Sequence, residues 1–424
     1  MIDKLRQVNI WLHAFLLPCI AAGLPFLQWS IGNHIPKVTS IALIALAANF
    51  VLFPGLPGRL KRIKERPIFW MLILPFIVDL IGMLHTENMK DGWRIITLHL
   101  SVLSLPLTIL GSDTSPKIIR NTLWALVIST IAATLLSFRN GFGFMNDLTA
   151  FRLDAERVIL MHRVYFGMYI DFCIIMLAAK FASDSRLVIR LLCAFIIGVL
   201  LWFIWLIAAK MAALALVLVA MGTTLLWLAG KGRKKALRGI IALAVIIPFG
   251  VYLYAPQLIV KARIIASGGI LVRENTAYNP LTSLDVRNMI WRLYIYTLNK
   301  NDAWLFGVGT GDVLDTMNKT YKLAGKYWQE SYFNAHNQYL EDIMRNGIPG
   351  LAALLAMFMV PLILAWQKRS LLAFALILLL ITCLFTECLM NRVTGVVFCV
   401  LLNTLMIYPL IDKNQFGLQA EKTV

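Results

Sequence analysis

Charged residues are scarce in this chain of 424 residues. They make up 15% of it, whereas 59% of the residues are hydrophobic. Soluble domains contain roughly 45–50% apolar residues. The composition therefore excludes an ordinary soluble domain and predicts an integral membrane protein.

Patterns that bind metal ions are absent from the sequence. It contains no acidic cluster, no DxD motif and no His/Cys set with the spacing of metal ligands. The six cysteines lie inside apolar runs without a CxxC pair, which is typical of small buried hydrophobic residues. We therefore expect neither a metal nor another cofactor.

Long apolar runs, by contrast, are abundant. A bilayer crossing needs about 20 predominantly apolar residues. Twelve runs meet or approach this length, so we expect an all-α, polytopic membrane protein with about twelve transmembrane helices. The first run follows Lys4 and Arg6 but lacks a convincing cleavage site, so we interpret it as a retained span. The runs are residues 8–29, 39–57, 68–86, 95–111, 119–137, 164–182, 187–207, 211–229, 238–255, 347–366, 370–389 and 391–411.

Lys and Arg are distributed unevenly between the two sets of connecting segments. The set that contains the N-terminus, residues 59–66 and residues 231–238 carries 21 of them, whereas the short segments of the other set carry nine. The positive-inside rule therefore places both termini in the cytoplasm. The net charge of +18 then reflects loops beside anionic lipid, and we expect no nucleic-acid partner.

The predicted spans divide the chain into three parts. Residues 1–255 hold helices one to nine, residues 256–346 form a periplasmic loop, and residues 347–424 hold helices ten to twelve and a short cytoplasmic tail. Loops of this length are usually functional or disordered. Tryptophans and periodic apolar positions predict that this one is folded, with an amphipathic helix at 284–299.

His336 opens the stretch HNQYLEDIMRNGIPG at the end of this loop. Its spacing predicts a short helix in which His336, Leu340 and Ile343 share one face. Gly347 fits the end of that helix, and Pro349 fits the first turn of the next. An isolated histidine more often packs or caps, but an imidazole here could also act as a general base.

Several cations are predicted on the same side of the membrane. Arg287 and Trp291 share a helical face, and the guanidinium could bind either lipid head groups or a phosphate. Lys210 and Arg163 begin predicted spans on that side. Such a set suits a diphosphate leaving group, so we expect a transferase that acts on a pyrophosphate-linked lipid.

The stretch LFGVGTG, residues 305–311, contains closely spaced glycines. It lacks the lysine and the context of a nucleotide-binding loop. We interpret it as a tight turn whose backbone amides could approach an anion.

Three signatures occur in order: Arg287-xxx-Trp291, then LFGVGTG, then His336-Asn337 with nine residues before Gly347-Ile348-Pro349-Gly350. Together they resemble the O-antigen ligase and polymerase superfamily of bacterial envelope glycosyltransferases. The resemblance implies a GT-C-type fold in the bacterial inner membrane. It also implies inverting transfer of a glycan from undecaprenyl pyrophosphate to an acceptor hydroxyl. The acceptor is the lipid A core in ligases and another lipid-linked repeat unit in polymerases.

The resemblance also assigns roles to residues. His336 corresponds to the family's base, and Arg287 to the arginine that holds the pyrophosphate. Lys210 stands where the family usually has an arginine, and it keeps the charge without the bidentate fork. Expected contacts to pyrophosphate or glycan are Lys210, Arg163, Arg292, Asn337 and Tyr339. Expected structural residues are Trp291, Gly307, Gly309, Gly347, Pro349 and Gly350.

The favoured interpretation is a ligase in lipopolysaccharide biosynthesis, and the nearest alternative is an O-antigen or exopolysaccharide polymerase. A transporter or glycolipid flippase of twelve spans belongs to a different class. Such transporters consist of two similar halves. Here the longest loop follows the ninth span and faces outward, which favours an enzyme.

Overall fold

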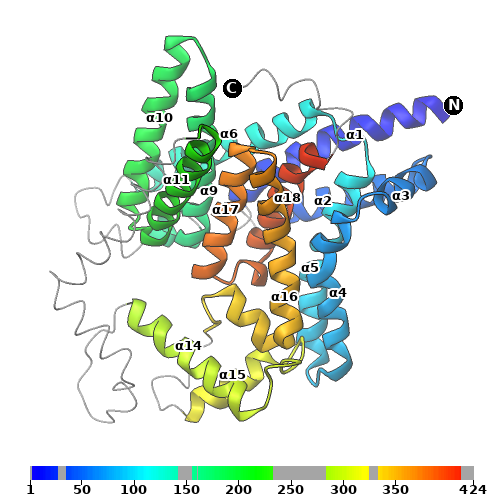
Figure 1. The fold of residues 1–424 in the computed structure, drawn as a ribbon, viewed down its shortest axis with the longest axis vertical. Helices are drawn as coiled ribbons and strands as arrows, with labels where there is room; N and C mark the ends of the chain where they lie inside the picture. The colour runs from blue at the N-terminus through cyan, green and yellow to red at the C-terminus, as the bar shows by residue number, and fades with distance from the viewer. Residues whose placement is uncertain are drawn as a thin grey trace.

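The computed structural model describes residues 2–26, 35–141, 155–159, 161–232, 283–323 and 333–411. Every regular element in these ranges is helical (Figure 1). The helices are α1 Ile2–Gly23, η1 Leu24–Phe26, α2 Ile35–Leu52, α3 Leu56–Lys64, α4 Ile68–Gly82, η2 Met83–His85, α5 Met89–Gly111, α6 Pro116–Gly141, α8 Ala155–Ile159, α9 Arg163–Ser183, α10 Leu187–Leu206, α11 Lys210–Gly230, α14 Ser283–Lys300, α15 Val313–Leu323, α16 Gln338–Gln367, α17 Leu371–Thr386, η5 Leu389–Asn391 and α18 Val393–Ile411.

Within the described chain, the helices agree with the predicted spans except at the second, 39–57. Nine are long and apolar enough to cross a membrane, and α2 with α3 adds a tenth if the bent pair is one span. The sixteen-residue α17 is apolar but shorter. The predicted ninth span, 238–255, lies outside the described residues. The prediction of an all-α, multi-pass protein is therefore confirmed for the described chain, while the total of twelve spans and the orientation of the termini stay predictions.

The second span is not the straight helix 39–57 that the sequence predicts. α2 ends at Leu52, and the chain turns by 101° into α3. Pro54 and Gly55 make the turn, because Gly55 has a φ of 99°, a left-handed conformation that glycine adopts without steric cost. α3 therefore runs across the direction of α2.

The C-terminal helices form the centre of the bundle. α18 is the most buried of the candidate spans in the described chain. It packs against α5 and α17, and α16 packs against α4 and α17. The ends of α16, α17 and α18 therefore meet helices from both halves of the sequence.

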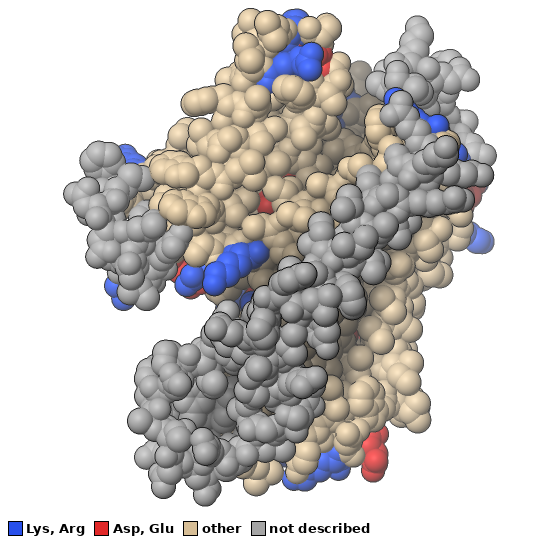
Figure 2. Space-filling view, turned by 60° about the vertical axis from the view of Figure 1, so that its left-hand side comes forward, with Lys and Arg blue, Asp and Glu red and all other residues tan. Residues whose placement is uncertain are grey.

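The outer surface of the bundle is apolar. Much of the described surface in Figure 2 carries neither basic nor acidic side chains. α10 is the clearest case, because a row of large apolar side chains on it is exposed. They are Leu187, Val188, Leu191, Leu192, Phe195, Leu201, Trp202 and Trp205. Such a face fits contact with lipid acyl chains.

α14 and α15 pack on each other at one end of the long axis (Figure 1). They cover a second apolar cluster that includes Ile290, Tyr294 and Met317 and extends to Ala335 and Met344. This end therefore has a core of its own, joined to the beginning of α16. The first part of the predicted loop, 256–282, lies outside the described residues.

Candidate active site

His336 lies directly before α16 in a left-handed backbone conformation. Its φ angle is 44°, which non-glycine residues adopt rarely. The Asn334 side chain accepts a hydrogen bond from the backbone N–H of His336 at 3.1 Å. The Asn337 side chain caps α16 by accepting from the backbone N–H of Leu340 at 3.2 Å. The prediction that His336 shares a helical face with Leu340 and Ile343 is wrong, because these asparagine contacts turn the chain before the helix begins.

His336 is paired with a buried carboxylate from another helix. Its Nδ1 lies 3.1 Å from each carboxylate oxygen of Glu387. Glu387 follows the last residue of α17, and its side chain is 4% exposed against 24% for His336. A carboxylate at Nδ1 favours the tautomer that carries the proton there and leaves Nε2 as the acceptor. In the described chain no hydrogen bond occupies Nε2, so this nitrogen is available to a substrate hydroxyl.

Two opposing effects act on the Glu387 carboxyl. Burial raises its pKa. The hydrogen bond and charge of His336, with the charge of His162 and the backbone N–H of Cys388, outweigh burial and leave the pKa below its ordinary value. Glu387 is therefore a carboxylate at neutral pH, able to orient the ring and to stabilise it once it is protonated.

A second group of charges begins α9. Nε2 of His162 and Nε of Arg163 each lie 3.5 Å from Oε1 of Glu156 on α8. Burial lowers the pKa of His162, and the charges of Arg392 and His336 add to this effect, while Glu156 and Glu387 oppose it. The charges of His336 and Glu387 therefore act on His162, which indicates that the start of α9 lies close to the candidate site.

Trp291 attaches α14 to the segment before α16, residues 333–337, which contains His336. The indole Nε1 donates to the backbone carbonyl of Ala335 at 2.8 Å, and the ring packs edge-on against Phe385 with centroids 5.7 Å apart. Arg287 lies one turn earlier on the same face of α14. Its Nε is buried without a hydrogen-bond partner in the described chain. Since buried donors are normally satisfied, this guanidinium is suited to receive an anionic ligand.

Lys210 is the exposed first residue of α11. The start of α11 packs closely on the start of α9, because a Cβ on Gly167 would lie 2.7 Å from that of Ala212. Lys210 and Arg163 thus begin neighbouring helices. Arg292 is half-buried, and in the described chain its side chain has no hydrogen bond or ion pair.

The glycine-rich segment docks onto the kink of α16. The N–H groups of Val308 and Gly309 donate to the carbonyls of Met344 and Arg345 at 2.9 and 3.1 Å. These amides do not face an anion as the sequence suggested, because α16 uses them. Gly347 interrupts α16 with φ 65° and ψ −153°. Pro349 follows in the next turn and is exposed.

Glycine is required at both partners of this contact. A Cβ on Gly307 would lie 2.3 Å from the carbonyl oxygen of Arg345, and one on Gly347 equally close, at 2.3 Å, to that of Leu305. A Cβ on Gly350 would lie 2.5 Å from the carbonyl oxygen of Asp342. The kink therefore depends on backbone contacts that no side chain could accommodate.

Tyr339 connects helices instead of facing an open site. Its hydroxyl donates to the carbonyl of Ile381 in α17 at 3.0 Å. This bond holds the first turn of α16 against α17, near the helix end that carries Glu387. The structure therefore gives Tyr339 a positioning contact, and its contact with a substrate stays a prediction.

A cavity of about 140 Å³ lies beside Phe333 and Asn334, in the segment that leads to His336. Buried Arg345 lines it, with Nη1 at 3.2 Å from Asp342 and Nη2 at 2.7 Å from Asn391. The lining combines apolar side chains with polar ones that include Asp91, Arg94, Asn334 and Glu341. Paired donors and acceptors of this kind suit a hydroxylated ligand.

Sequence reasoning missed Glu387 and Glu156. Glu387 stands in LFTECLMNR, at the end of an apolar run. An acidic residue at the edge of a span is a signal of function, and it could have identified this position. In the described chain, no group of three or more His, Cys, Asp or Glu side chains is arranged to hold a metal ion.

Residues 172–355 match the family model described as O-Antigen ligase. The matched segment contains Lys210, Arg287, the glycine-rich segment and His336. The match confirms the resemblance that the three signatures indicate. No curated protein sequence matches the chain significantly.

Proposed function

We propose that this O-antigen ligase-like chain is a membrane glycosyltransferase that moves a glycan from undecaprenyl pyrophosphate to an acceptor hydroxyl. The observation that carries the proposal is the His336–Glu387 pair, with Nδ1 at 3.1 Å from each carboxylate oxygen. On α14, one turn before the Trp291 that donates to Ala335, Arg287 has a buried Nε without a hydrogen-bond partner in the described chain. A base and an anion-binding group are what transfer from a diphosphate requires.

In the proposed reaction, Nε2 of His336 accepts the proton of the acceptor hydroxyl. The acceptor oxygen attacks the anomeric carbon, and the bond from that carbon to the diphosphate oxygen breaks. The bonding electrons leave with the diphosphate, whose charge Arg287, Lys210 and Arg163 stabilise. A single displacement inverts the configuration. The proton remains on His336, opposite the Glu387 carboxylate.

Ligation to the lipid A core is the favoured acceptor chemistry, with polymerisation as the alternative. The same base and the same cations serve both, because only the molecule that carries the hydroxyl differs. The cavity lined by Asn334 and Arg345 is the proposed place for a sugar. We place the site at the periplasmic face of the inner membrane, from the predicted orientation of the spans.

The test is glycan transfer by purified protein from a lipid-linked donor. We expect His336→Ala to lose transfer and Arg287→Ala to lose most of it. Arg186→Ala is the matched control for lost charge, because this arginine is exposed and, among the described residues, is ion-paired with Asp184 alone. Glycan joined to lipid A core would identify a ligase, and longer lipid-linked chains a polymerase. Full activity of both site variants would refute the proposed site.

A further inference from the structure

A second cavity, of about 560 Å³, lies at the opposite end of the bundle from His336. α5 connects the two ends. The backbone N–H of Asn88, just before α5, donates to Asp312 beside the glycine-rich segment at 2.7 Å, whereas Ser112 and Asp113, just after α5, line the cavity. A helix of 23 residues spans about 34 Å. The cavity is therefore separate from the candidate active site.

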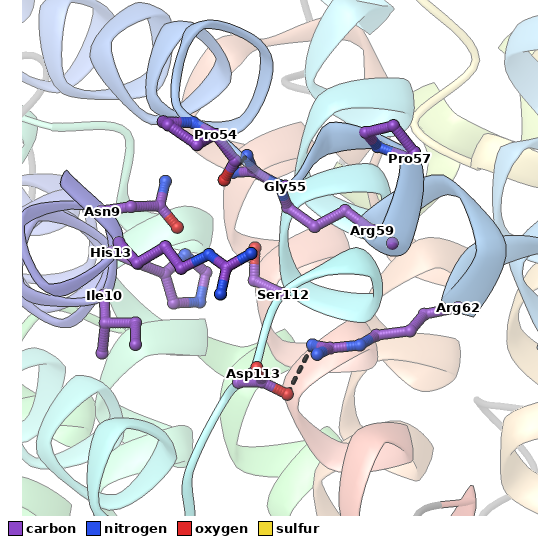
Figure 3. Close-up of a pocket in the computed structure, with 12 residues that line it drawn as sticks. Asn9, Ile10, His13, Pro54, Gly55, Pro57, Arg59, Arg62, Ser112 and Asp113 are labelled. Atoms are coloured by element: carbon purple, nitrogen blue, oxygen red, sulfur yellow. Dashed lines mark hydrogen bonds and ion pairs between the residues drawn. The ribbon is translucent and has the colours of Figure 1, made fainter. Parts of the chain in front are cut away.

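Four segments surround this cavity (Figure 3), and one of them is the turn after α5 that carries Ser112 and Asp113. α1 contributes Arg6, Asn9 and His13. The turn after α2 contributes Pro54 and Gly55, and α3 contributes Arg59 and Arg62. Among the described lining residues, Asp113 is the only carboxylate, and Arg62 is ion-paired with it (Figure 3). The lining therefore carries an excess of positive charge.

Arg59 is the buried member of these positively charged residues. It is 6% exposed, and its guanidinium donates to the backbone carbonyls of Asn49 at 3.3 Å and Pro54 at 3.0 Å, and also to that of Phe53. In the described chain neither Arg59 nor exposed Arg6 has a carboxylate within ion-pair distance. Neutral carbonyls satisfy the donors of a guanidinium but do not compensate its charge. An anion bound in the cavity would compensate that charge.

The position of α3 indicates where such an anion comes from. The 101° bend directs α3 across the bundle, and its last turn carries Lys61, Arg62 and Lys64. Leu60 on the same helix is 48% exposed. A short basic helix with an exposed leucine is typical of a membrane interface. The predicted orientation places this end at the cytoplasmic leaflet, where anionic lipids concentrate.

We propose that this cavity is a binding site for a phosphate group, presented by the head group of an anionic phospholipid. Arg6 and Arg59 supply the positive charge, and Asn9 and Ser112 supply hydrogen bonds. A free phosphate ester has the same chemistry and is the other possible source. The site is independent of the proposed glycan transfer, and so is its test.

The experiment measures phospholipid bound to the full-length purified protein by native mass spectrometry, with phosphatidylglycerol and phosphatidylcholine as the two probes. We expect preferential binding of phosphatidylglycerol, and Arg6→Ala to weaken it about fivefold, equivalent to about 1 kcal/mol for one basic side chain near the membrane surface. Lys117→Ala is the matched control. It removes one positive charge from the beginning of α6, near the same end of the bundle, but Lys117 is exposed and does not line the cavity. It should leave binding unchanged.

A second arm separates the two sources of phosphate. Glycerol 3-phosphate is added to delipidated protein, and the midpoint of thermal unfolding is measured. A rise that Arg6→Ala abolishes would support the site and identify a soluble ligand, whereas no rise together with selective phosphatidylglycerol binding supports the lipid. Equal weakening by Arg6→Ala and Lys117→Ala would overturn the proposal, since only diffuse surface charge would then act. So would the absence of both phosphatidylglycerol selectivity and a glycerol 3-phosphate effect.

Discussion

Nδ1 of His336 lies 3.1 Å from both carboxylate oxygens of Glu387, which stands 51 positions later in the chain. If Glu387 orients the base, Glu387→Gln should lower kcat by about 10²-fold, the lower end of what general acid–base catalysis contributes. KM should change little, because the amide removes charge without emptying the space. Steady-state transfer kinetics measure both constants. Exposed Glu65→Gln is the control, and an unchanged kcat for Glu387→Gln would exclude the orienting role.

The same carboxylate predicts a pH dependence of stability. Interactions with His336 and His162 outweigh burial and hold the pKa of Glu387 below its ordinary value of 4.5. A depressed carboxyl pKa stabilises the folded protein above the unfolded value, and that stabilisation is lost as the pH falls through the folded value. The difference in stability between wild type and Glu387→Gln should therefore stay constant as the pH falls to about 4.5, and it should decrease only below that pH. Thermal unfolding of both proteins between pH 8 and pH 3 tests this, and a decline between pH 7 and pH 6 would contradict it.

Trp291→Phe tests the attachment of α14 to the site. The indole Nε1 donates to the carbonyl of Ala335 at 2.8 Å, and loss of one such bond costs about 1 kcal/mol. Because Ala335 precedes His336, kcat should also fall, on the order of tenfold through misplacement of the base. Trp304→Phe is the matched control, since its indole donates to Asn299 at 2.8 Å away from His336. Equal effects on kcat would show that Trp291 does not position the base.

Gly347→Ala should destabilise the protein strongly. A left-handed conformation costs a non-glycine residue about 1–3 kcal/mol, and the new Cβ would meet the Leu305 carbonyl at 2.3 Å. Gly198→Ala in α10 is the control, because a Cβ there meets nothing within 4 Å. It should raise stability by about 0.5–1 kcal/mol, as expected for alanine in a helix interior. Chemical denaturation in detergent compares the two, and a Gly347→Ala protein as stable as wild type would show that the kink tolerates a side chain.

The positions of the helices could be predicted because an apolar run is a local property of the sequence. The bend after α2 could not be placed from hydropathy alone, because residues 53–57 are as compatible with a continued span as with a turn. Pro54-Gly55 was the local signal for it, and the left-handed Gly55 makes the turn. Helix existence was thus predictable, and helix direction was not.

The candidate site was only partly predictable. His336 and Arg287 were predicted from signatures and stay predictions as site residues. Glu387 contacts His336 from another helix, and such a pairing has no local spacing in the sequence. The glycine-rich segment was correctly assigned to a tight turn. The prediction that its backbone amides approach an anion was wrong. These amides donate to the carbonyls of Met344 and Arg345, a long-range contact that the local sequence does not indicate.

Gly307 and Gly347 face one another's chain segments reciprocally. A Cβ on Gly307 would collide with Arg345, two residues before Gly347, and a Cβ on Gly347 would collide with Leu305, two residues before Gly307. A substitution at either glycine forces the same two backbone segments apart. When one substitution has already separated these segments, the second adds little further steric overlap. The double mutant should therefore lose much less stability than the sum of the two single losses. In thermodynamic terms the two glycines form one coupled unit, and homologous chains should keep or replace them together.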